Sequence, residues 1–335
     1  AIKQRVWTSE HVAKKIENTL QITKNSSERL ATYLSSNLVN NTINSSVKFD
    51  SLFEKFPDKS IRSIKVNYDA NTQAGVWLPA NTQLNNQNKA LLIKTKYGVE
   101  AYGLGAKQQP YVDTWFMPES GGIVIYWPNE KDFIYQAEAN FSYKETQWML
   151  PARPENNPNK ESYWTDLSFD PVPRTWMLSA VSPIYLAEQW IGTVGHDIPL
   201  SNILAETELL NEQESSRFIL TTSKQHVIAS DVYANELKSQ TGDVKSAHLP
   251  DARWKQVINL AIEENIANDL PKSYQVGNEL FSVSNIGSQN WLLVTSMPLS
   301  PITEKNNSSF PNLKNITSKI EVFAQHSKLL TTVVK

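Results

Sequence analysis

The sequence predicts an α+β protein in which one long N-terminal helix packs along two stacked antiparallel-sheet units of unequal size. Three observations lead to this fold class. Residues 2–38 contain neither proline nor glycine, and their apolar side chains recur at helical spacing. Two stretches of β-rich segments and turns follow, and each includes regions of helical periodicity. The second stretch repeats the order of the first at a smaller size, so we expect two copies of one plan.

Composition limits the class of protein before any motif is considered. A chain of 335 residues suits two domains, and 40% hydrophobic residues with ten tryptophans are enough for packed cores. The net charge of −2 gives no basic surface for a nucleic acid. Without cysteine there is no disulfide, thiol nucleophile or thiolate metal site. No apolar run approaches the roughly 20 residues that a membrane span requires.

The N-terminal segment is predicted to form one helix. Its apolar residues lie mostly three, four or seven positions apart, close to a heptad pattern, and they are Ile2, Val6, Ala13, Ile16, Leu20, Leu30, Leu34 and Leu38. Thr23 and Ser27 interrupt this stripe, so we expect a weak contact there. About 37 residues would span about 55 Å. Such a helix is longer than a single domain, so it should run along both units or extend toward a membrane.

The first sheet unit is predicted from alternating β-rich segments. A hairpin is expected over residues 112–128, with its turn at 119–122, and residues 141–150 are read as one short helix. A helix over 200–210 closes the unit. The other expected strands are 60–68, 74–79, 163–170, 175–186 and 190–198, with a turn at 187–189 between the last two.

The second unit is predicted to be smaller. Residues 217–231 form a hairpin, residues 251–265 an amphipathic helix, and residues 272–298 two or three antiparallel strands. A last helix is expected from about residue 313 to the end. The predicted divisions are listed in chain order: 1–48 for the first helix, 49–205 for the larger unit, 206–300 for the smaller unit and 301–335 for the exit segment.

This order, together with three local motifs, resembles the double Cache (dCache) extracytoplasmic sensor domain of bacterial transmembrane receptors. The motifs are SAVSPIYLAEQWIGTVGHDIPLSNIL at 179–204, YWTDLSFD at 163–170 and TQWMLPA at 146–152. The resemblance implies two PAS-like modules, of which the first is membrane-distal and binds the ligand. It also implies a periplasmic or extracellular domain of a cell-membrane protein. From the start AIKQRVW and the end HSKLLTTVVK we expect membrane spans on both sides.

The resemblance also implies a ligand site in the larger module. Amino-acid-binding members use an Arg and a Trp for the ligand carboxylate, and a Tyr and two Asp for its amine. In this sequence the Trp is Trp148, and the two Asp are Asp170 and Asp197. The Arg position holds Thr146, so the carboxylate half of the site is damaged. The complete set of predicted site residues is Asp170, Asp197, Trp148, Thr146, Met149, Ser168, Phe141, Trp115 and Tyr126.

The residue types then favour a cationic ligand. Arginine supplies the bidentate donor that a carboxylate prefers, whereas threonine offers one neutral hydroxyl. Two carboxylates facing one cavity repel each other unless a cation lies between them, and nearby indoles add cation–π attraction. We therefore expect a small amine or quaternary ammonium. The alternatives are an amino-acid sensor that holds the carboxylate by backbone amides, a soluble solute- or carbohydrate-binding module, and an interaction domain with a vestigial pocket.

Other interpretations of the same residues stay open at this point. Asp197 is also a candidate N-cap for the following helix, and Asp170 is by default a turn residue. The five histidines have no metal-ligand spacing and no nucleophile–base pair stands out, so we assign neither metal, cofactor nor enzyme activity. An enzymatic output domain, such as a histidine kinase or a diguanylate cyclase, would lie beyond this sequence. The stripe at Ala13, Ile16 and Leu20 is expected to form a homodimer in the full receptor.

Overall fold

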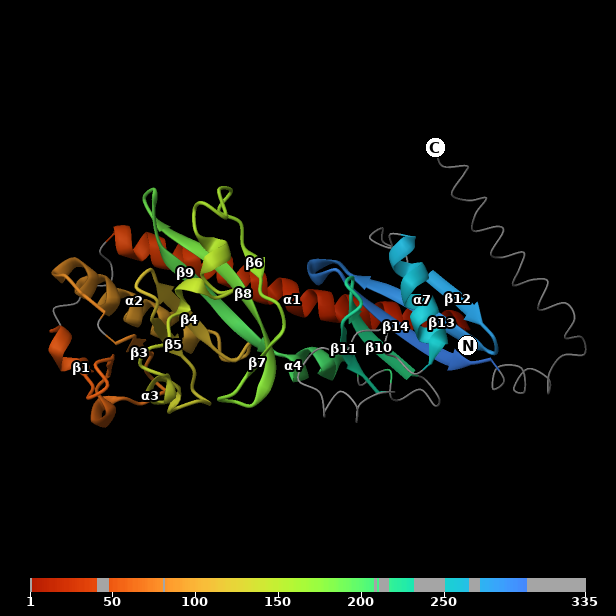
Figure 1. Ribbon diagram of the computed structural model, residues 1–335, viewed down its shortest axis with the longest axis horizontal. Helices are drawn as coiled ribbons and strands as arrows, with labels where there is room; N and C mark the ends of the chain where they lie inside the picture. Colours follow the sequence, from red (N-terminus) through yellow and green to blue (C-terminus); the bar gives the residue numbers. More distant parts are fainter. Residues whose placement is uncertain are drawn as a thin grey trace, which may run out of the picture.

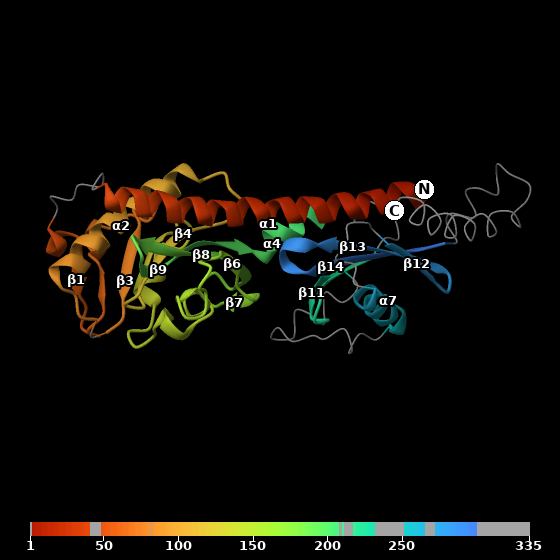
Figure 2. The ribbon, with the colours of Figure 1, turned by 90° about the horizontal axis from the view of Figure 1, so that it is seen from above.

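The first helix extends along the entire described part of the molecule. The structure is a computed structural model, and it describes residues 2–40, 48–80, 82–207, 210, 217–231, 251–264 and 272–299. Helix α1 (Ile2–Val39) has 38 residues and is therefore about 57 Å long. Two antiparallel sheets lie one after the other along it (Figures 1 and 2). The predicted α+β fold class is confirmed.

The larger sheet has nine strands, and each paired neighbour is antiparallel. Their order is β1-β2-β3-β5-β4-β9-β8-β6, with β7 also paired to β8. The bounds are β1 (Phe53–Lys55), β2 (Ile61–Ser63), β3 (Gly75–Leu78), β4 (Thr114–Pro118), β5 (Ile123–Tyr126), β6 (Tyr163–Trp164), β7 (Ser168–Asp170), β8 (Thr175–Leu186) and β9 (Gln189–Pro199). The long hairpin β8–β9 is thus flanked by β4 on one side and by the short strands β6 and β7 on the other.

Two helices cover one face of this sheet. Helices α1 and α2 (Asn86–Gly105) pack on each other, and α2 packs on β4 and β5 (Figure 2). The sequence analysis missed α2, because its buried positions include Thr95, Lys96 and Gly98 and so blur the apolar stripe. A capping box between Asn85 and Asn88 was the available signal for its start. The short helix α3 (Phe133–Gln136) and the irregular segment up to β7 lie on the opposite face (Figure 2).

The apolar stripe of α1 is buried within the chain. Ala13, Ile16 and Leu20 pack against the end of the β8–β9 hairpin and the smaller sheet. The predicted dimer contact through these three residues is therefore wrong, since they are not available to a second subunit. Thr23 and Ser27 are also fully buried, and the Ser27 hydroxyl lies 2.8 Å from that of Ser182 on β8. The predicted weak contact is instead a polar packing contact between helix and sheet.

The smaller module has five antiparallel strands with a helix on the face away from α1. The strand order is β11-β10-β14-β13-β12. The bounds are β10 (Arg217–Thr222), β11 (Val227–Ser230), α7 (Ala252–Glu263), β12 (Lys272–Val276), β13 (Glu279–Ile286) and β14 (Trp291–Pro298). Asp251 caps α7, as expected for a helix that begins there, because its carboxylate accepts the Arg253 backbone N–H at 3.0 Å.

An apolar cluster joins the two modules. It combines α1, the end of the β8–β9 hairpin, helix α4 (Leu200–Leu204) and the inner face of the smaller sheet. Polar contacts reinforce this junction: the Ser9 and Ser284 hydroxyls are 3.4 Å apart, and the Ser288 backbone N–H donates to Glu17 at 3.0 Å. The modules are thus linked through α1 as well as through the chain between them.

Two predicted helices need correction or fall outside the described residues. Residues 141–150 do not form one helix but two 3₁₀ turns, Tyr143–Glu145 and Leu150–Ala152. Pro151 and the hydroxyl contacts of Ser142 and Thr146 favour tight turns there. The expected last helix from about residue 313 lies outside the described residues. Among the helices described, none combines the length and the apolarity needed to cross a bilayer.

Candidate ligand-binding site

Strand β9 carries neighbouring residues with opposite roles. His196 faces the helices, where its ring stacks on Tyr111 with centroids 3.8 Å apart. Asp197 faces the other side of the sheet, where its carboxylate accepts the Trp115 indole N–H at 3.0 Å. The alternation follows from the pleat of a strand. Helix α4 begins after Pro199 without a side-chain cap, so Asp197 is not a helix cap.

Glycine lets the Trp115 indole lie across β9. Trp115 and Gly195 are paired between β4 and β9, and a Cβ on Gly195 would collide with the indole ring. A second glycine, Gly192, has a φ of +145° and lies where the β8–β9 register shifts. This bulge sets Ser179 directly opposite Asp197, whereas uninterrupted pairing from the turn would place Leu178 there. The bulge therefore determines which β8 side chain reaches the site.

A third carboxyl, which the sequence analysis missed, lies beside Asp197. Asp113 immediately precedes β4, and its Oδ1 accepts the Asp197 backbone N–H at 2.9 Å. The side chain is only 2% exposed, and its Oδ2 is buried without a hydrogen-bond partner. Asp113 and Asp197 are 84 positions apart in sequence, so only the pairing of β4 with β9 brings them together.

An aromatic wall from the segment between β5 and β6 faces these carboxyls. Trp148 donates its indole N–H to the Ser179 hydroxyl at 2.7 Å, and Ser179 hydrogen-bonds Asp197. The Tyr143 ring stands edge-on to Trp148, with centroids 5.8 Å apart. Phe141, 41% exposed, is edge-on to Tyr143 at 4.9 Å. Tyr143 and Ser179 are further contributors that the sequence analysis did not single out.

Asp170 reaches the same region from the end of β7. Its Oδ1 accepts the Val172 backbone N–H at 2.8 Å, so the predicted turn role is confirmed. The side chain remains half-buried. Its negative charge raises the pKa values of both Asp113 and Asp197, which places it within electrostatic range of them. The turn bond uses one oxygen, and the second oxygen can accept from a ligand.

Burial and mutual repulsion govern the protonation of this group. Desolvation raises the pKa of Asp113 well above its ordinary range, and the charge of Asp197 raises it further. Desolvation likewise raises the pKa of Asp170 and that of Asp197, the latter opposed by hydrogen bonds from Ser179 and Trp115. Tyr143 has its pKa raised by desolvation and then by the three carboxylates, so its hydroxyl remains a proton donor.

In the part of the chain that the structure describes, no basic side chain forms an ion pair with these acids. Within the described ranges, none of the ion pairs includes Asp113, Asp170 or Asp197. Buried acids without a cationic partner either hold protons or attract a cation. The site can therefore take a positively charged group between carboxylates and aromatic rings, where Trp148 and Tyr143 would add cation–π attraction.

The remaining predicted residues have less direct positions. Met149 is buried in the core under the aromatic wall, and Ser168 lies at the edge of the sheet opposite Met177. Thr146 donates its hydroxyl to the Tyr143 carbonyl at 2.6 Å, so it closes its own turn. Tyr126 is not part of the group: it packs in the core under α2, on the other face of the sheet.

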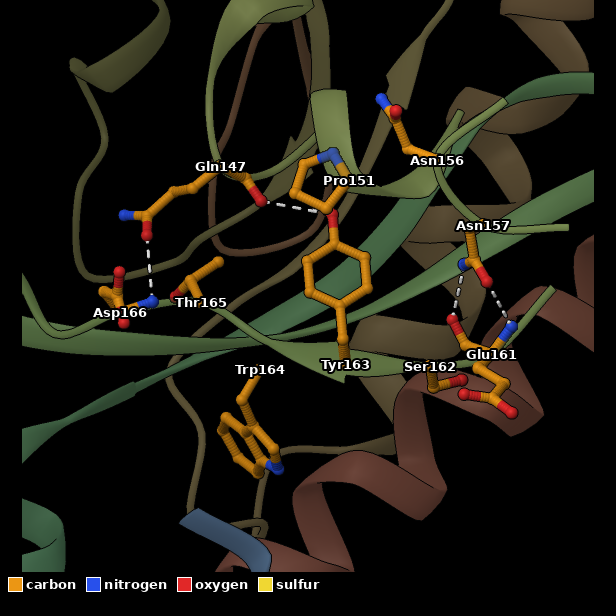
Figure 3. A pocket seen from close by; sticks show the side chains of 10 residues that line it. All are labelled: Gln147, Pro151, Asn156, Asn157, Glu161, Ser162, Tyr163, Trp164, Thr165 and Asp166. Carbon is orange, nitrogen blue, oxygen red and sulfur yellow. Dashed lines mark hydrogen bonds between the residues drawn. The ribbon is translucent and has the colours of Figure 1, made fainter. Parts of the chain in front are cut away.

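Two grooves of this module lie beside the carboxyls. One of about 360 Å³ is lined by residues 147–166, and Figure 3 shows the Tyr163 hydroxyl donating to the Gln147 carbonyl. Its lining is tied to the site, because the Thr165 backbone N–H donates to the Ser179 carbonyl and the Ser179 N–H donates to the Thr165 hydroxyl. A larger groove of about 830 Å³ lies between the start of α2 and the far end of the sheet. We base the site on the convergence of charged and aromatic groups, not on groove size.

Comparisons with known proteins agree with this architecture. Residues 100–205 match the family described as methyl-accepting chemotaxis protein-like, first PDC sensor domain. The sensory domain of the Campylobacter jejuni chemoreceptor Tlp3 is similar over 90% of this chain and 96% of its own, with 12% identity and a TM-score of 0.51. Its ligand-binding domain in complex with L-norvaline gives 12% identity, coverage of 90% and 93%, and a TM-score of 0.50.

An extracellular domain from a histidine kinase gives a similar match. The extracellular domain of mmHK1S-Z3, a predicted histidine kinase, has 10% identity and a TM-score of 0.51, with coverage of 92% of this chain and 98% of its own. Among curated proteins, no sequence matches the chain. This chain has the two-module fold of these domains, and Asp113, Asp170 and Asp197 all lie within the residues that match the first PDC sensor domain.

Proposed function

We propose that this domain senses an amino acid, bound by its ammonium group among Asp113, Asp170 and Asp197. The observation that carries the proposal is the set of carboxyls facing Trp148 and Tyr143 without a basic partner in the described residues. An ammonium group has three donors and matches such a set of acceptors. The domain would occupy the outer side of the cytoplasmic membrane, between flanking spans that lie outside this sequence, with the larger module as the membrane-distal one.

An amino acid fits better than the simple amine that the sequence favours. The similar Tlp3 domain binds L-norvaline. Thr146 uses its hydroxyl to close its own turn, so a donor to the ligand carboxylate must come from another residue. The Tyr143 hydroxyl stays protonated beside the site and can donate to it. Such a neutral donor is weaker than a bidentate arginine, so we expect modest affinity and a larger contribution from the ammonium half.

A matched ligand series tests this proposal. L-norvaline, butylamine and pentanoate share a chain and differ in which charged groups they carry. Calorimetry should rank L-norvaline first, butylamine second and pentanoate last. Tightest binding of butylamine would instead restore the amine interpretation, and binding of none of the three, nor of any amino acid in a thermal-shift screen, would reject the proposal.

Two variants locate the site. Asp197→Asn and Asp170→Asn remove one charged acceptor each, and we expect at least a tenfold loss of affinity from a charged hydrogen bond of about 1.5–3 kcal/mol. Asp166→Asn is the matched control, because Asp166 is exposed on the same segment as the site and its carboxylate lies outside it. Unchanged affinity in both site variants would place the ligand elsewhere.

A further inference from the structure

Among the described acids, Asp113 has a buried carboxyl oxygen that lacks a hydrogen-bond partner. Its Oδ1 has one hydrogen bond, from the Asp197 backbone N–H, and its Oδ2 has none although it is buried. An ionised carboxylate in such surroundings is costly, because burial removes water without supplying enough donors. The cost is removed if the carboxyl carries a proton and donates it to a neighbouring acceptor.

The Asp197 carboxylate is the candidate acceptor for a proton on Asp113. The Asp197 backbone N–H already donates to Asp113, and the charge of Asp197 raises the pKa of Asp113, so the two carboxyls lie within electrostatic range of each other. Hydrogen bonds from Ser179 and from the Trp115 indole oppose the rise in the pKa of Asp197. The ionised form of Asp197 is thus better stabilised by hydrogen bonds than that of Asp113. The proton is therefore more stable on Asp113. This is the arrangement of two acids that cannot both ionise at close range.

The other titratable groups around the pair do not change this assignment. Asp170 from β7 adds negative charge, and Tyr143 from the aromatic wall stays protonated. On the helix side, His196 contacts the Asp113 carbonyl and the Thr114 hydroxyl, and burial lowers its pKa to about 4, so it is neutral. Arg29 of α1 acts on His196 and Tyr111, across the sheet from the carboxyl pair.

We propose that Asp113 and Asp197 share a single proton in the ligand-free domain, and that the ammonium group of the ligand takes its place and releases it. The second half of this inference rests on the proposed function, whereas the first half does not. In the exchange only the carboxyl O–H bond breaks. The proton passes to solvent, the ammonium keeps its three hydrogens, and both carboxylates are ionised in the complex.

The consequence is a pH-dependent affinity with a defined sign. Acid favours the protonated, ligand-free pair, so binding weakens as the pH falls below the raised pKa of Asp113. The expected slope is about a tenfold loss of affinity per pH unit, since one proton competes with one ligand. Sensing would therefore respond to the acidity of the surroundings as well as to ligand concentration.

Carbon-13 NMR of the ligand-free domain, labelled at the aspartate carboxyls, tests the shared proton. A pH titration should show one carboxyl that remains protonated well above the ordinary range, and Asp113→Asn should remove that signal. The control Asp166→Asn should retain it. If every aspartate of the wild-type domain titrates in the ordinary range, the inference is wrong, whether or not Asp113→Asn folds.

Calorimetry with L-norvaline, at one pH in buffers of different ionisation enthalpy, tests the displacement. We expect about one proton released per bound ligand in the wild-type domain and a value near zero in Asp113→Asn. Binding without proton release would overturn this inference and leave the proposed function intact. Failure of L-norvaline and of all other amino acids to bind would overturn the proposed function and with it the displacement, whereas the NMR titration would still decide the shared proton.

Discussion

At the scale of single residues, one peptide unit separates two chemical environments. Asp197 faces carboxyls and indoles, whereas His196 is enclosed between the sheet and α1. Both groups are buried, and burial disfavours the charged form of each. Burial therefore raises the pKa of Asp197, and it keeps His196 neutral. Asp113 belongs to both environments, through its carboxyl on one side and its carbonyl on the other.

His196 makes the domain sensitive to acid. Its pKa is lowered by burial from 6.5 to about 4, so between these values the unfolded chain binds a proton that the folded chain does not. Folding stability should fall as the pH drops through this window, by up to about 3 kcal/mol. Chemical denaturation at several pH values measures this loss, and His196→Gln should reduce it.

The raised pKa of Asp113 acts in the opposite direction. Its folded form keeps the proton longer than the unfolded chain, so the ligand-free domain loses stability as the pH rises past the ordinary carboxyl range. Comparing His196→Gln and Asp113→Asn, each with the wild type, separates the two effects of pH on stability. An equal acid-induced loss in His196→Gln and the wild type would contradict the role given to His196.

At the scale of elements, α1 and the β8–β9 hairpin position the site. The helix buries one continuous stripe against both sheets, and the hairpin crosses the larger sheet between β4 and the short edge strands. The bulge at Gly192 then fixes which residues of the hairpin face the ligand side. A shift by one residue would exchange the two faces of the strand.

Two apolar residues of α1 provide a matched test of its packing. Leu20 is fully buried in the junction cluster, whereas Ile22 is 44% exposed on the other side of the same helix. Leu20→Ala should lower the free energy of unfolding by about 2–5 kcal/mol. Ile22→Ala should change it by less than about 0.5 kcal/mol. Equal effects in denaturant titrations would show that this face of α1 is not the packed one.

The bulge can be tested by adding a methyl group. Gly192→Ala would bring a Cβ against the Met117 carbonyl at a φ that side chains rarely adopt. We expect weaker β4–β9 pairing, lower stability and lower ligand affinity, because Asp197 would lose its place beside Trp115 and Asp113. Gly287→Ala is the control, since nothing lies near its added Cβ. A Gly192→Ala domain with wild-type stability and affinity would disprove this role of the bulge.

At the scale of the whole molecule, the site and the junction are close along the chain. Asp197 lies at the end of β9, and Leu200 and Ile203 of α4 already belong to the cluster shared by α1 and the smaller sheet. A change at the strand end on ligand binding would therefore reach the smaller module and α1 without a long path. Such a change shifts an equilibrium only if the ligand has different affinities for the two arrangements.

An introduced disulfide would test the packing of α1 on the smaller sheet, in a chain that has no cysteine of its own. The buried hydroxyls of Ser9 and Ser284 are 3.4 Å apart, so the pair Ser9→Cys and Ser284→Cys should form a disulfide under air and raise the thermal midpoint. Mobility on non-reducing gels and thermal melts measure both effects. Pairing Ser284→Cys with Lys14→Cys is the control, because the Lys14 side chain is 71% exposed. Equal cross-linking of both pairs would contradict the packing of α1 on this sheet.

Local signals were enough to predict the fold class, the long helix, the second module and most strands, because periodicity and turn residues can be read within a short window of sequence. The sequence analysis missed α2, whose buried polar residues hide the stripe, and it misread residues 141–150 and the role of Thr23 and Ser27. The motifs also indicated Trp148, Asp170 and Asp197 as candidates. Only the tertiary structure brought Asp113 to Asp197, removed Tyr126 to the opposite face and buried the helix stripe within one chain. Strand pairing and the bulge at Ile191 and Gly192 decide these positions, and neither is encoded in the spacing of neighbouring residues.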